Sequence, residues 1–381
     1  MLPPAAGRLP GRAIVPAMDR TVPVRIVEIQ SDSGFDWGDA GIGAAAALAL
    51  AAIVFGAVVV RRSVVGPRQG EKEMPSATRF MAVLALVLVP AATAQAKTFS
   101  DWAPATNAES VPGTSSELNT PGQDGCPIQS PDGLSLFIAS NRPRFAGDTR
   151  TDLDIWVARR ASKDAPWGAP QNLGEPVNST ADDFCPTPVR GDRLFFVSRK
   201  VVPGVTCGMG DIYLTREDPA HGWREPEHLG CQADGGPNTP LDEQGPSYVK
   251  TGGPSLYFSS GPDIYVSKRH GNGSFGPGTP VAELNSPAMD IQPNVRRDGR
   301  EVVFASNRGG PTAFGGQDLW VATRNGVNGP WSAPVNLGSA TNTAANETRP
   351  SLSWDATTLY FGRAPGVEGP LADIYFTTRS N

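Results

Sequence analysis

The sequence predicts an all-β, five-bladed β-propeller made of four-stranded antiparallel blades, and three observations support this prediction. A short pattern recurs five times: Asn, then Ser or Thr, three variable residues, a carboxylate, two residues and Pro. Its spacing of roughly 50 residues indicates an array of identical supersecondary units. Each unit holds short apolar runs without helical periodicity. The last unit lacks its fourth run, and a matching run precedes the first unit.

The recurring pattern places one Asn and one acid at the start of each predicted blade. We expect the acids to form a ring around one mouth of the central channel, where they could hold Ca²⁺ or attract a cationic ligand. The alternative, which we favour, is structural: Asn and acid accept backbone N–H bonds in the loop between blades. The Asn residues are Asn119, Asn178, Asn238, Asn285 and Asn342, and the acids are Asp124, Asp183, Glu243, Asp290 and Glu347.

A tight turn after the Pro leads into the second strand of each unit. Asp132-Gly133 and Asp298-Gly299 are typical of hairpins, because Asp and Gly tolerate positive φ. The second strand ends near Ser-Asn-Arg or a variant of it. We expect the recurring arginines to form a structural ion pair with a carboxylate of their own blade. These arginines are Arg142, Arg199, Arg308 and Arg363.

The third strand begins at an Asp and carries an aromatic residue, which we expect in the core between blades. The fourth strand is predicted to run from an aromatic residue to a Pro, as in 167–170, 223–226, 275–280 and 331–334, because Pro suits an outer edge. Trp102-Ala103-Pro104 is expected to supply the missing fourth strand of the last blade and close the ring. The third-strand Asp residues are Asp154, Asp211, Asp263, Asp318 and Asp373.

Two units carry the sequence pattern most completely: Pro131-Asp132-Gly133 with Ser140-Asn141-Arg142 and Asp154-Ile155-Trp156, and Asp298-Gly299 with Ser306-Asn307-Arg308 and Asp318-Leu319-Trp320. They resemble the TolB-like, WD-type β-propeller repeat of bacterial envelope proteins. The resemblance covers roughly residues 98–381. It implies an exported binding or scaffold module and implies no conserved reaction.

The first hundred residues differ from the repeats. Residues 41–60 form an apolar stretch long enough to span a bilayer, and Arg61-Arg62 follow it. Residues 74–96 have the three regions of a secretory signal peptide, ending in Ala94-Gln95-Ala96. We favour a true start at Met74, with 1–73 added by a misassigned start; the alternative is a membrane anchor. Both place the propeller, residues 97–381, outside the cytoplasm, with the membrane contacted only through the N-terminal segment.

Composition narrows the partners and the compartment. The net charge is −5, and the propeller has no basic run, which argues against nucleic acid. Four cysteines in an exported chain predict disulfides. We favour Cys207–Cys231 and leave Cys126–Cys185 open; buried free thiols are the alternative.

The sequence contains neither G-x-S-x-G nor H-E-x-x-H, and no catalytic residue is identified. We therefore expect a monomeric, non-enzymatic propeller that binds a protein or an envelope polymer. The alternative is a glycoside hydrolase or lectin-like carbohydrate binder that uses acids at the channel mouth, such as Asp124, Asp183 and Glu243. Equivalent poses of the five acids would favour the first reading. One pair with distinct partners beside a pocket would favour the second.

Overall fold

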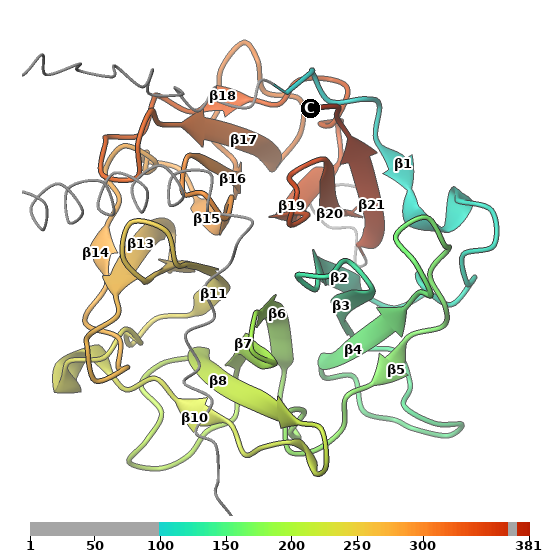
Figure 1. Ribbon diagram of the computed structural model, residues 1–381, viewed down its shortest axis with the longest axis vertical. Helices are drawn as coiled ribbons and strands as arrows, with labels where there is room; N and C mark the ends of the chain where they lie inside the picture. The colour runs from blue at the N-terminus through green and yellow to red at the C-terminus, as the bar shows by residue number, and fades with distance from the viewer. Residues whose placement is uncertain (1–98, 365–371) are drawn as a thin grey trace, which may run out of the picture. The chain divides into compact units, whose positions relative to one another are not determined.

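The computed structural model describes residues 99–364 and 372–381, which form a closed ring of five antiparallel sheets (Figure 1). The predicted all-β, five-bladed propeller is confirmed. The described residues contain no α-helix, and none of their helices is long or apolar enough to cross a membrane. The segments predicted at 1–73 and 74–96 lie outside the described residues. Two short 3₁₀ turns interrupt the strands, η1 (Ala108–Ser110) and η2 (Gln232–Asp234).

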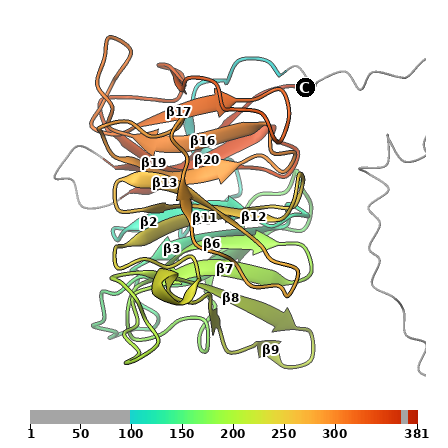
Figure 2. The same ribbon diagram turned by 90° about the vertical axis from the view of Figure 1, so that its left-hand side faces the viewer.

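Each blade starts at the channel with an inner strand (Figure 1) and turns into a second strand; Figure 2 shows the strands from the side. The inner strands are β2 (Asp124–Gln129), β6 (Asp183–Val189), β11 (Glu243–Val249), β15 (Asp290–Val295) and β19 (Asn346–Leu352). The second strands are β3 (Ser135–Ser140), β7 (Arg193–Ser198), β12 (Ser255–Ser260), β16 (Glu301–Ser306) and β20 (Thr358–Ala364).

The third strand of each blade pairs with the second over its whole length, and a two-residue strand lies outside it. In blade 2 the third strand also pairs with β9 (Gly222–Trp223). The third strands are β4 (Asp154–Arg159), β8 (Asp211–Asp218), β13 (Asp263–Lys268), β17 (Asp318–Thr323) and β21 (Asp373–Thr378). The outer strands are β5 (Gln171–Asn172), β10 (Glu227–His228), β14 (Thr279–Pro280), β18 (Val335–Asn336) and, for blade 5, β1 (Thr106–Asn107).

The outer strands correct the predicted bounds. Three of them begin directly after Pro170, Pro226 and Pro334 rather than ending there. Proline has no N–H to donate, so the ladder to the third strand starts at the next residue. In blade 3, Pro280 instead occupies the second strand position, opposite Tyr265.

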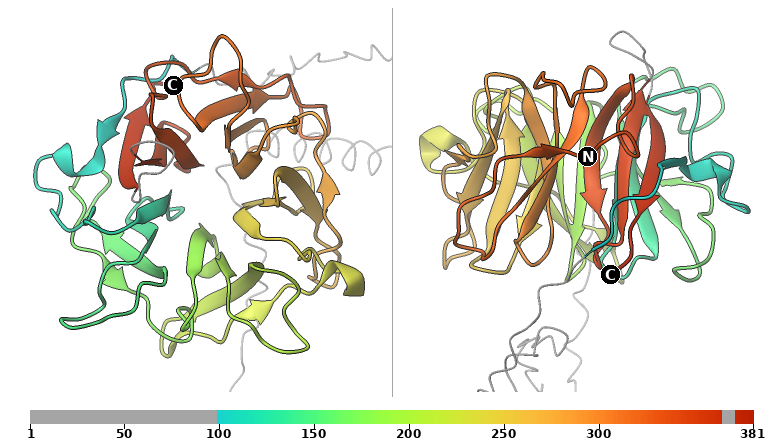
Figure 3. Two further views of the ribbon diagram at one scale, coloured as in Figure 1. Left: turned by 180° about the vertical axis from the view of Figure 1, so that it is seen from behind. Right: turned by 90° about the horizontal axis from the view of Figure 1, so that it is seen from above.

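The N-terminal strand closes the ring, as the sequence predicts. β1 pairs antiparallel with β21, with Thr106 opposite Phe376 and Asn107 opposite Tyr375 (Figure 3). The strand lies a few residues beyond the predicted Trp102-Ala103-Pro104. Trp102 instead packs against the core between blades 4 and 5, and the Arg379 guanidinium lies 4.3 Å from the centroid of its ring.

Every inner strand has a bulge two residues after its acid. The bulged residues have φ between 48° and 57°, and they line the central channel. Such a bulge bends the strand and turns one side chain away from the ladder. The bulged residues are Cys126, Cys185, Gly245, Gln292 and Arg349.

Both disulfides are present. Cys126–Cys185 links the bulges of β2 and β6 across two neighbouring blades, and Cys207–Cys231 closes a 24-residue loop in blade 2. The bond that the sequence left open is therefore formed. The bulges of the two adjacent inner strands bring the Cα atoms of these cysteines to 4.9 Å.

The apolar core lies between neighbouring blades. One cluster joins Phe137 and Ile155 of blade 1 to Phe196 and Tyr213 of blade 2. Trp156 and Trp320 are also buried, as predicted for the third-strand aromatics, whereas Tyr265 and Tyr375 are only half-buried.

Candidate functional site

The recurring Asn ties each blade to the next one. Its amide oxygen accepts the backbone N–H of the residue after the third-strand Asp of the preceding blade, at 2.7–2.8 Å. Asn342, for example, also returns a bond from Nδ2 to the Leu319 carbonyl at 3.0 Å. Two bonds to one strand residue hold the blades in register. The N–H donors are Ile155, Ile212, Ile264, Leu319 and Ile374.

The five acids, called the ring acids below, are fully buried, with no exposed surface. Each accepts the N–H of the Ser or Thr that follows the recurring Asn, at 2.5–3.1 Å. The acids thus cap the loop between blades, as the structural interpretation expects. Ligand or cation binding by the whole ring stays a prediction.

Three of the four recurring arginines pair with the ring acid of their own blade. Arg142 Nη2 donates to Asp124 Oδ1 at 2.5 Å. Arg308 pairs with Asp290 in the same way. Arg363 comes from two positions earlier in the second strand, where blades 1 and 4 have a serine, and its Nε donates to Glu347 at 2.8 Å.

Arg199 has a different role. It follows Ser198 directly, whereas Arg142 stands two residues after Ser140. Its guanidinium donates to Asp182 at 2.9 Å and to Asp242 at 2.8 Å on the surface. The residue that matches Arg142 in blade 2 is Lys200, which is exposed. The number of residues between the serine and the arginine distinguishes the two blades, and the sequence pattern did not take this number into account.

Two ring acids therefore have no arginine among the described residues. Asp183 Oδ1 and Glu243 Oε2 are buried without a hydrogen-bond partner. Burial raises the pKa of Asp183 to about 6, against the lowering effect of nearby serine hydroxyls. Burial likewise raises the pKa of Glu243 to about 7. The five acids therefore differ in their partners, and two of them have the raised pKa that is common at functional sites.

The central channel is nearly closed. Its cavity is about 30 Å³, room for about one water molecule. Arg349 occupies part of it, and a Cβ at Gly125 would lie 2.8 Å from its Nη1. Burial, and then the nearby Arg199, lower the pKa of Arg349 to about 10. A sugar ring does not fit a cavity of this size, so a carbohydrate would have to bind elsewhere on the propeller.

Two of the third-strand Asp residues accept a bond from an outer-strand Asn. Asp154 and Asp318 accept from the Nδ2 of Asn172 and Asn336 at 2.7 and 2.8 Å. In blade 2, His228 replaces this Asn.

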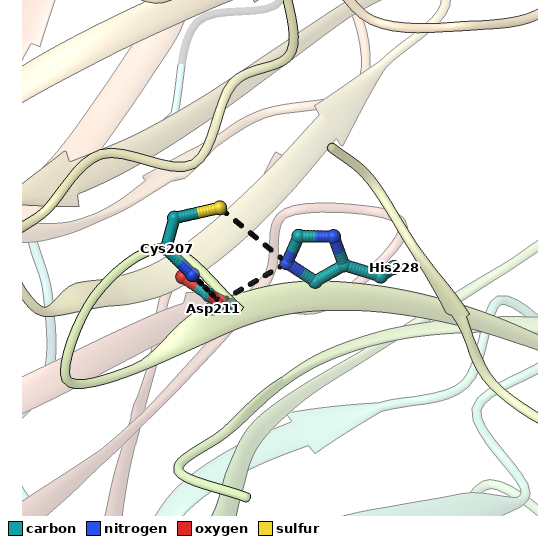
Figure 4. A group of neighbouring side chains, drawn as sticks. All are labelled: Cys207, Asp211 and His228. Carbon is teal, nitrogen blue, oxygen red and sulfur yellow. Dashed lines mark hydrogen bonds and ion pairs between the residues drawn. The ribbon is translucent and has the colours of Figure 1, made fainter. Parts of the chain in front are cut away.

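His228 belongs to a cluster with two potential metal ligands. Its Nε2 lies 3.0 Å from Asp211 Oδ2 and 3.7 Å from Cys207 Sγ (Figure 4). The sulfur is bonded to Cys231, so it is not a thiolate. One imidazole and one carboxylate remain, fewer than the donors that a zinc site uses. The pair instead continues the hydrogen-bond network of the other blades.

Several cavities outside the channel are large enough for a small ligand, and two of them bear on function. The first, called the blade 1–5 groove, has a volume of about 390 Å³ and lies beside the turns between inner and second strands. The second, called the blade-2 cavity, has a volume of about 280 Å³ and lies beside Asp183. The groove is lined by residues that include Thr114, Gln129, Lys163, Trp167, Trp354, Asp355 and Tyr360, and the cavity by residues that include Val177, Asp183, Phe196, Ser198, Lys200, Tyr213 and His228.

No protein-family profile matches the chain, and no curated protein matches it in sequence. Several solved structures resemble it. A GH43 endo-arabinanase from Bacillus licheniformis has 14% identity and a TM-score of 0.46, over 69% of this chain and 94% of that one. An endo-arabinase from Bacteroides thetaiotaomicron has 14% identity and a TM-score of 0.44, over 74% and 97%. A glycosyl hydrolase from Bacteroides ovatus has 8% identity and a TM-score of 0.46, over 73% and 94%. These values express a likeness of fold alone.

The expectation of a non-enzymatic module for a protein or an envelope polymer is wrong. That expectation took a scaffold role from the propeller fold, whereas the solved structures above are named as an endo-arabinanase, an endo-arabinase and a glycosyl hydrolase. The fold therefore gives no ground for that role, and the function must be inferred from the cavities themselves.

Proposed function

We propose that the propeller binds carbohydrate in the blade 1–5 groove. The observation that carries the proposal is a pair of buried polar atoms in the groove lining, Thr114 Oγ1 and Trp354 Nε1. Neither has a hydrogen-bond partner among the described residues. A buried polar group without a partner costs free energy. Sugar hydroxyls donate and accept at once, so one saccharide could satisfy both atoms.

The aromatic lining of the groove suits the apolar face of a sugar ring. Trp354 is half-buried, and the guanidinium groups of Arg190 and Arg297 lie 5.3 and 5.7 Å from the centroid of its ring. These contacts hold the indole in place. Trp167 and Tyr360 are each 5% exposed and form the apolar floor. Aromatic walls with a few convergent polar groups are typical of small-molecule sites.

The polar lining favours binding over hydrolysis. Asp355 Oδ1 accepts from the hydroxyls of Ser353 and Thr357, both at 2.7 Å. Partial burial raises the pKa of Asp355, but these bonds outweigh it, and the pKa lies below its usual value. A glycosidase needs a carboxyl group that stays protonated to act as general acid. The ring acids with raised pKa, Asp183 and Glu243, do not line this groove.

The proposal includes an extracytoplasmic location and a TolB-like origin of the repeat. Two disulfides suit an oxidising compartment. The recurring turn, Ser-Asn-Arg and Asp-aromatic positions occupy equivalent places in blades 1 and 4, which supports a common repeat.

Binding is tested by titrating the full chain with neutral pentose and hexose oligosaccharides by calorimetry. Trp354→Ala should weaken binding by about 1–2 kcal/mol, or roughly 5–30-fold. Trp354→Phe keeps the aromatic face but removes the N–H, so it should lose less. Trp223→Ala is the matched control, because Trp223 is also half-buried but lines a different cavity.

Two outcomes would contradict the proposal: no oligosaccharide binds the unaltered chain, or Trp354→Ala and Trp223→Ala weaken binding equally. Release of reducing ends in the same samples would show hydrolysis. The reaction would then have to use carboxylates outside this groove.

A further inference from the structure

The five blades present the same internal site in five versions, and blades 1 and 4 show what fills it. In blade 1 the guanidinium of Arg142 donates to Asp124, to the Leu118 carbonyl at 2.9 Å and to the Ser140 hydroxyl at 2.8 Å. It also lies 5.3 Å from the centroid of the Trp156 ring. The site is thus a socket for a guanidinium group, with a carboxylate, a carbonyl, a hydroxyl and an aromatic face.

Blade 4 repeats this socket with the equivalent residues. Arg308 donates to Asp290, to the Leu284 carbonyl at 2.6 Å and to the Ser306 hydroxyl at 3.0 Å. Its guanidinium lies 5.1 and 5.2 Å from the ring centroids of Phe304 and Trp320. The ligand chemistry of the socket is therefore established twice within this chain.

Blade 2 keeps the socket and lacks its arginine. Asp183 and Ser198 match Asp290 and Ser306, and Phe196 and Tyr213 match the two rings that enclose the Arg308 guanidinium. These four residues line the blade-2 cavity of about 280 Å³. The fifth part of the socket is Val177, which precedes the recurring Asn as Leu284 does, and it also lines the cavity.

Two polar atoms in this cavity have no partner in the described part of the chain. They are Asp183 Oδ1, on a side chain with no exposed surface, and Tyr213 Oη. Lys200 stands where the arginine would stand, but its side chain is exposed, and no ion pair joins it to Asp183 among the described residues. A buried carboxylate gains most from a cation that can reach it.

We propose that the blade-2 cavity binds a guanidinium group supplied by another molecule. The planar guanidinium would donate to Asp183 Oδ1 and stack against Phe196 and Tyr213, as Arg308 does in blade 4. Guanidinium suits this geometry better than ammonium, because its fork of donors fits a carboxylate and its plane stacks on rings. The site is separate from the blade 1–5 groove and does not depend on carbohydrate binding.

The test is calorimetric titration of the full chain at pH 7.5 with L-arginine amide. L-citrulline amide is the neutral control of the same shape, and L-lysine amide is the ammonium control. We expect arginine amide to bind, and citrulline amide to bind at least about tenfold more weakly, since it lacks the charge-assisted bonds. Methylguanidine and the tripeptide Gly-Arg-Gly distinguish a small guanidine from an arginine side chain in a peptide.

Three variants place the ligand in the cavity. Asp183→Asn should abolish the preference for arginine amide. Lys200→Arg should rebuild the socket of blades 1 and 4, raise the melting temperature of the free protein and block the ligand. Lys200→Met removes the competing amine and should retain or strengthen binding. A thermal melt of each variant checks that it folds.

The proposal is overturned if the unaltered chain binds no arginine amide at millimolar concentration, or if Asp183→Asn and Lys200→Arg bind it unchanged. Binding by Lys200→Met alone would also overturn it, because that result would mean that Lys200 fills the cavity in the natural chain.

Discussion

Arg142 of blade 1 and Lys200 of blade 2 occupy the same position of the repeat, but only Arg142 reaches the ring acid of its blade. Arg142 lies 2.5 Å from Asp124 and is 7% exposed, whereas Lys200 is exposed to solvent. This difference leaves Asp183 buried without a counter-charge. Glu243 also lacks an arginine partner, so three ring acids are paired with arginine and two are not.

The first prediction concerns the buried arginines. Arg142→Ala should lower the free energy of unfolding by about 3–5 kcal/mol, because it leaves Asp124 buried without its partner. Arg199→Ala should cost less than about 1 kcal/mol, since that arginine is 38% exposed and pairs at the surface. Urea unfolding of the two variants measures both. Equal losses would show that the buried pair contributes no more than the surface one.

The second prediction concerns pH and the two unpaired acids. A raised pKa in the folded state means that Asp183 and Glu243 favour folding while protonated. Their contribution is fully present near pH 4 and is lost as pH rises through about 6 and 7. Asp183→Asn should therefore raise the unfolding free energy at pH 8 by up to about 3 kcal/mol and leave it nearly unchanged at pH 4.

Asp124→Asn is the matched control for the pH experiment, because Asp124 is paired with Arg142. It should destabilise the protein at pH 8, the opposite sign to Asp183→Asn. A loss of stability in both variants at pH 8 would contradict the division of the ring acids into two classes.

The third prediction concerns the disulfides. Cys126–Cys185 spans 59 residues and Cys207–Cys231 spans 24. Loop-closure entropy predicts that replacing either pair with serine costs about 2–5 kcal/mol, and slightly more for the longer loop. Thermal melts of the two double variants measure these costs, and thiol titration of the denatured natural chain should find no free cysteine. One reactive pair in that titration would refute the corresponding bond.

The fourth prediction concerns ring closure. Deleting residues 99–107 removes β1 and exposes the edge of β21, which lies beside it in the ring. An open strand edge promotes association between chains. We expect a lower melting temperature and concentration-dependent oligomers by light scattering. A truncated chain that stays monomeric and melts like the full chain would show that β1 adds nothing to closure.

Much of the fold and part of the candidate site could be predicted from the sequence. The constant spacing from Asn119 to Asp124, found five times, predicts the number of blades and the start of each inner strand to within one residue, because each blade repeats the same local hydrogen bonds. The outer strands were misplaced, since a two-residue strand beside Pro170 or Pro226 has almost no periodic signal. The sequence also did not show which carboxylate Arg142 meets, because the spacing shows that two charges recur but not how close their side chains come.

By itself, the sequence determined the all-β ring, its five blades and its closing strand, because these follow from repetition and short-range patterns. Only the tertiary structure decided that the Cys126 and Cys185 bulges meet, that the channel is nearly closed and that Asp183 lacks a counter-charge. Each of these depends on side chains brought together from distant parts of the chain. Whether a buried carboxylate has a partner depends on a few ångströms of side-chain reach, as Arg142 and Lys200 show, and a linear pattern does not contain that distance.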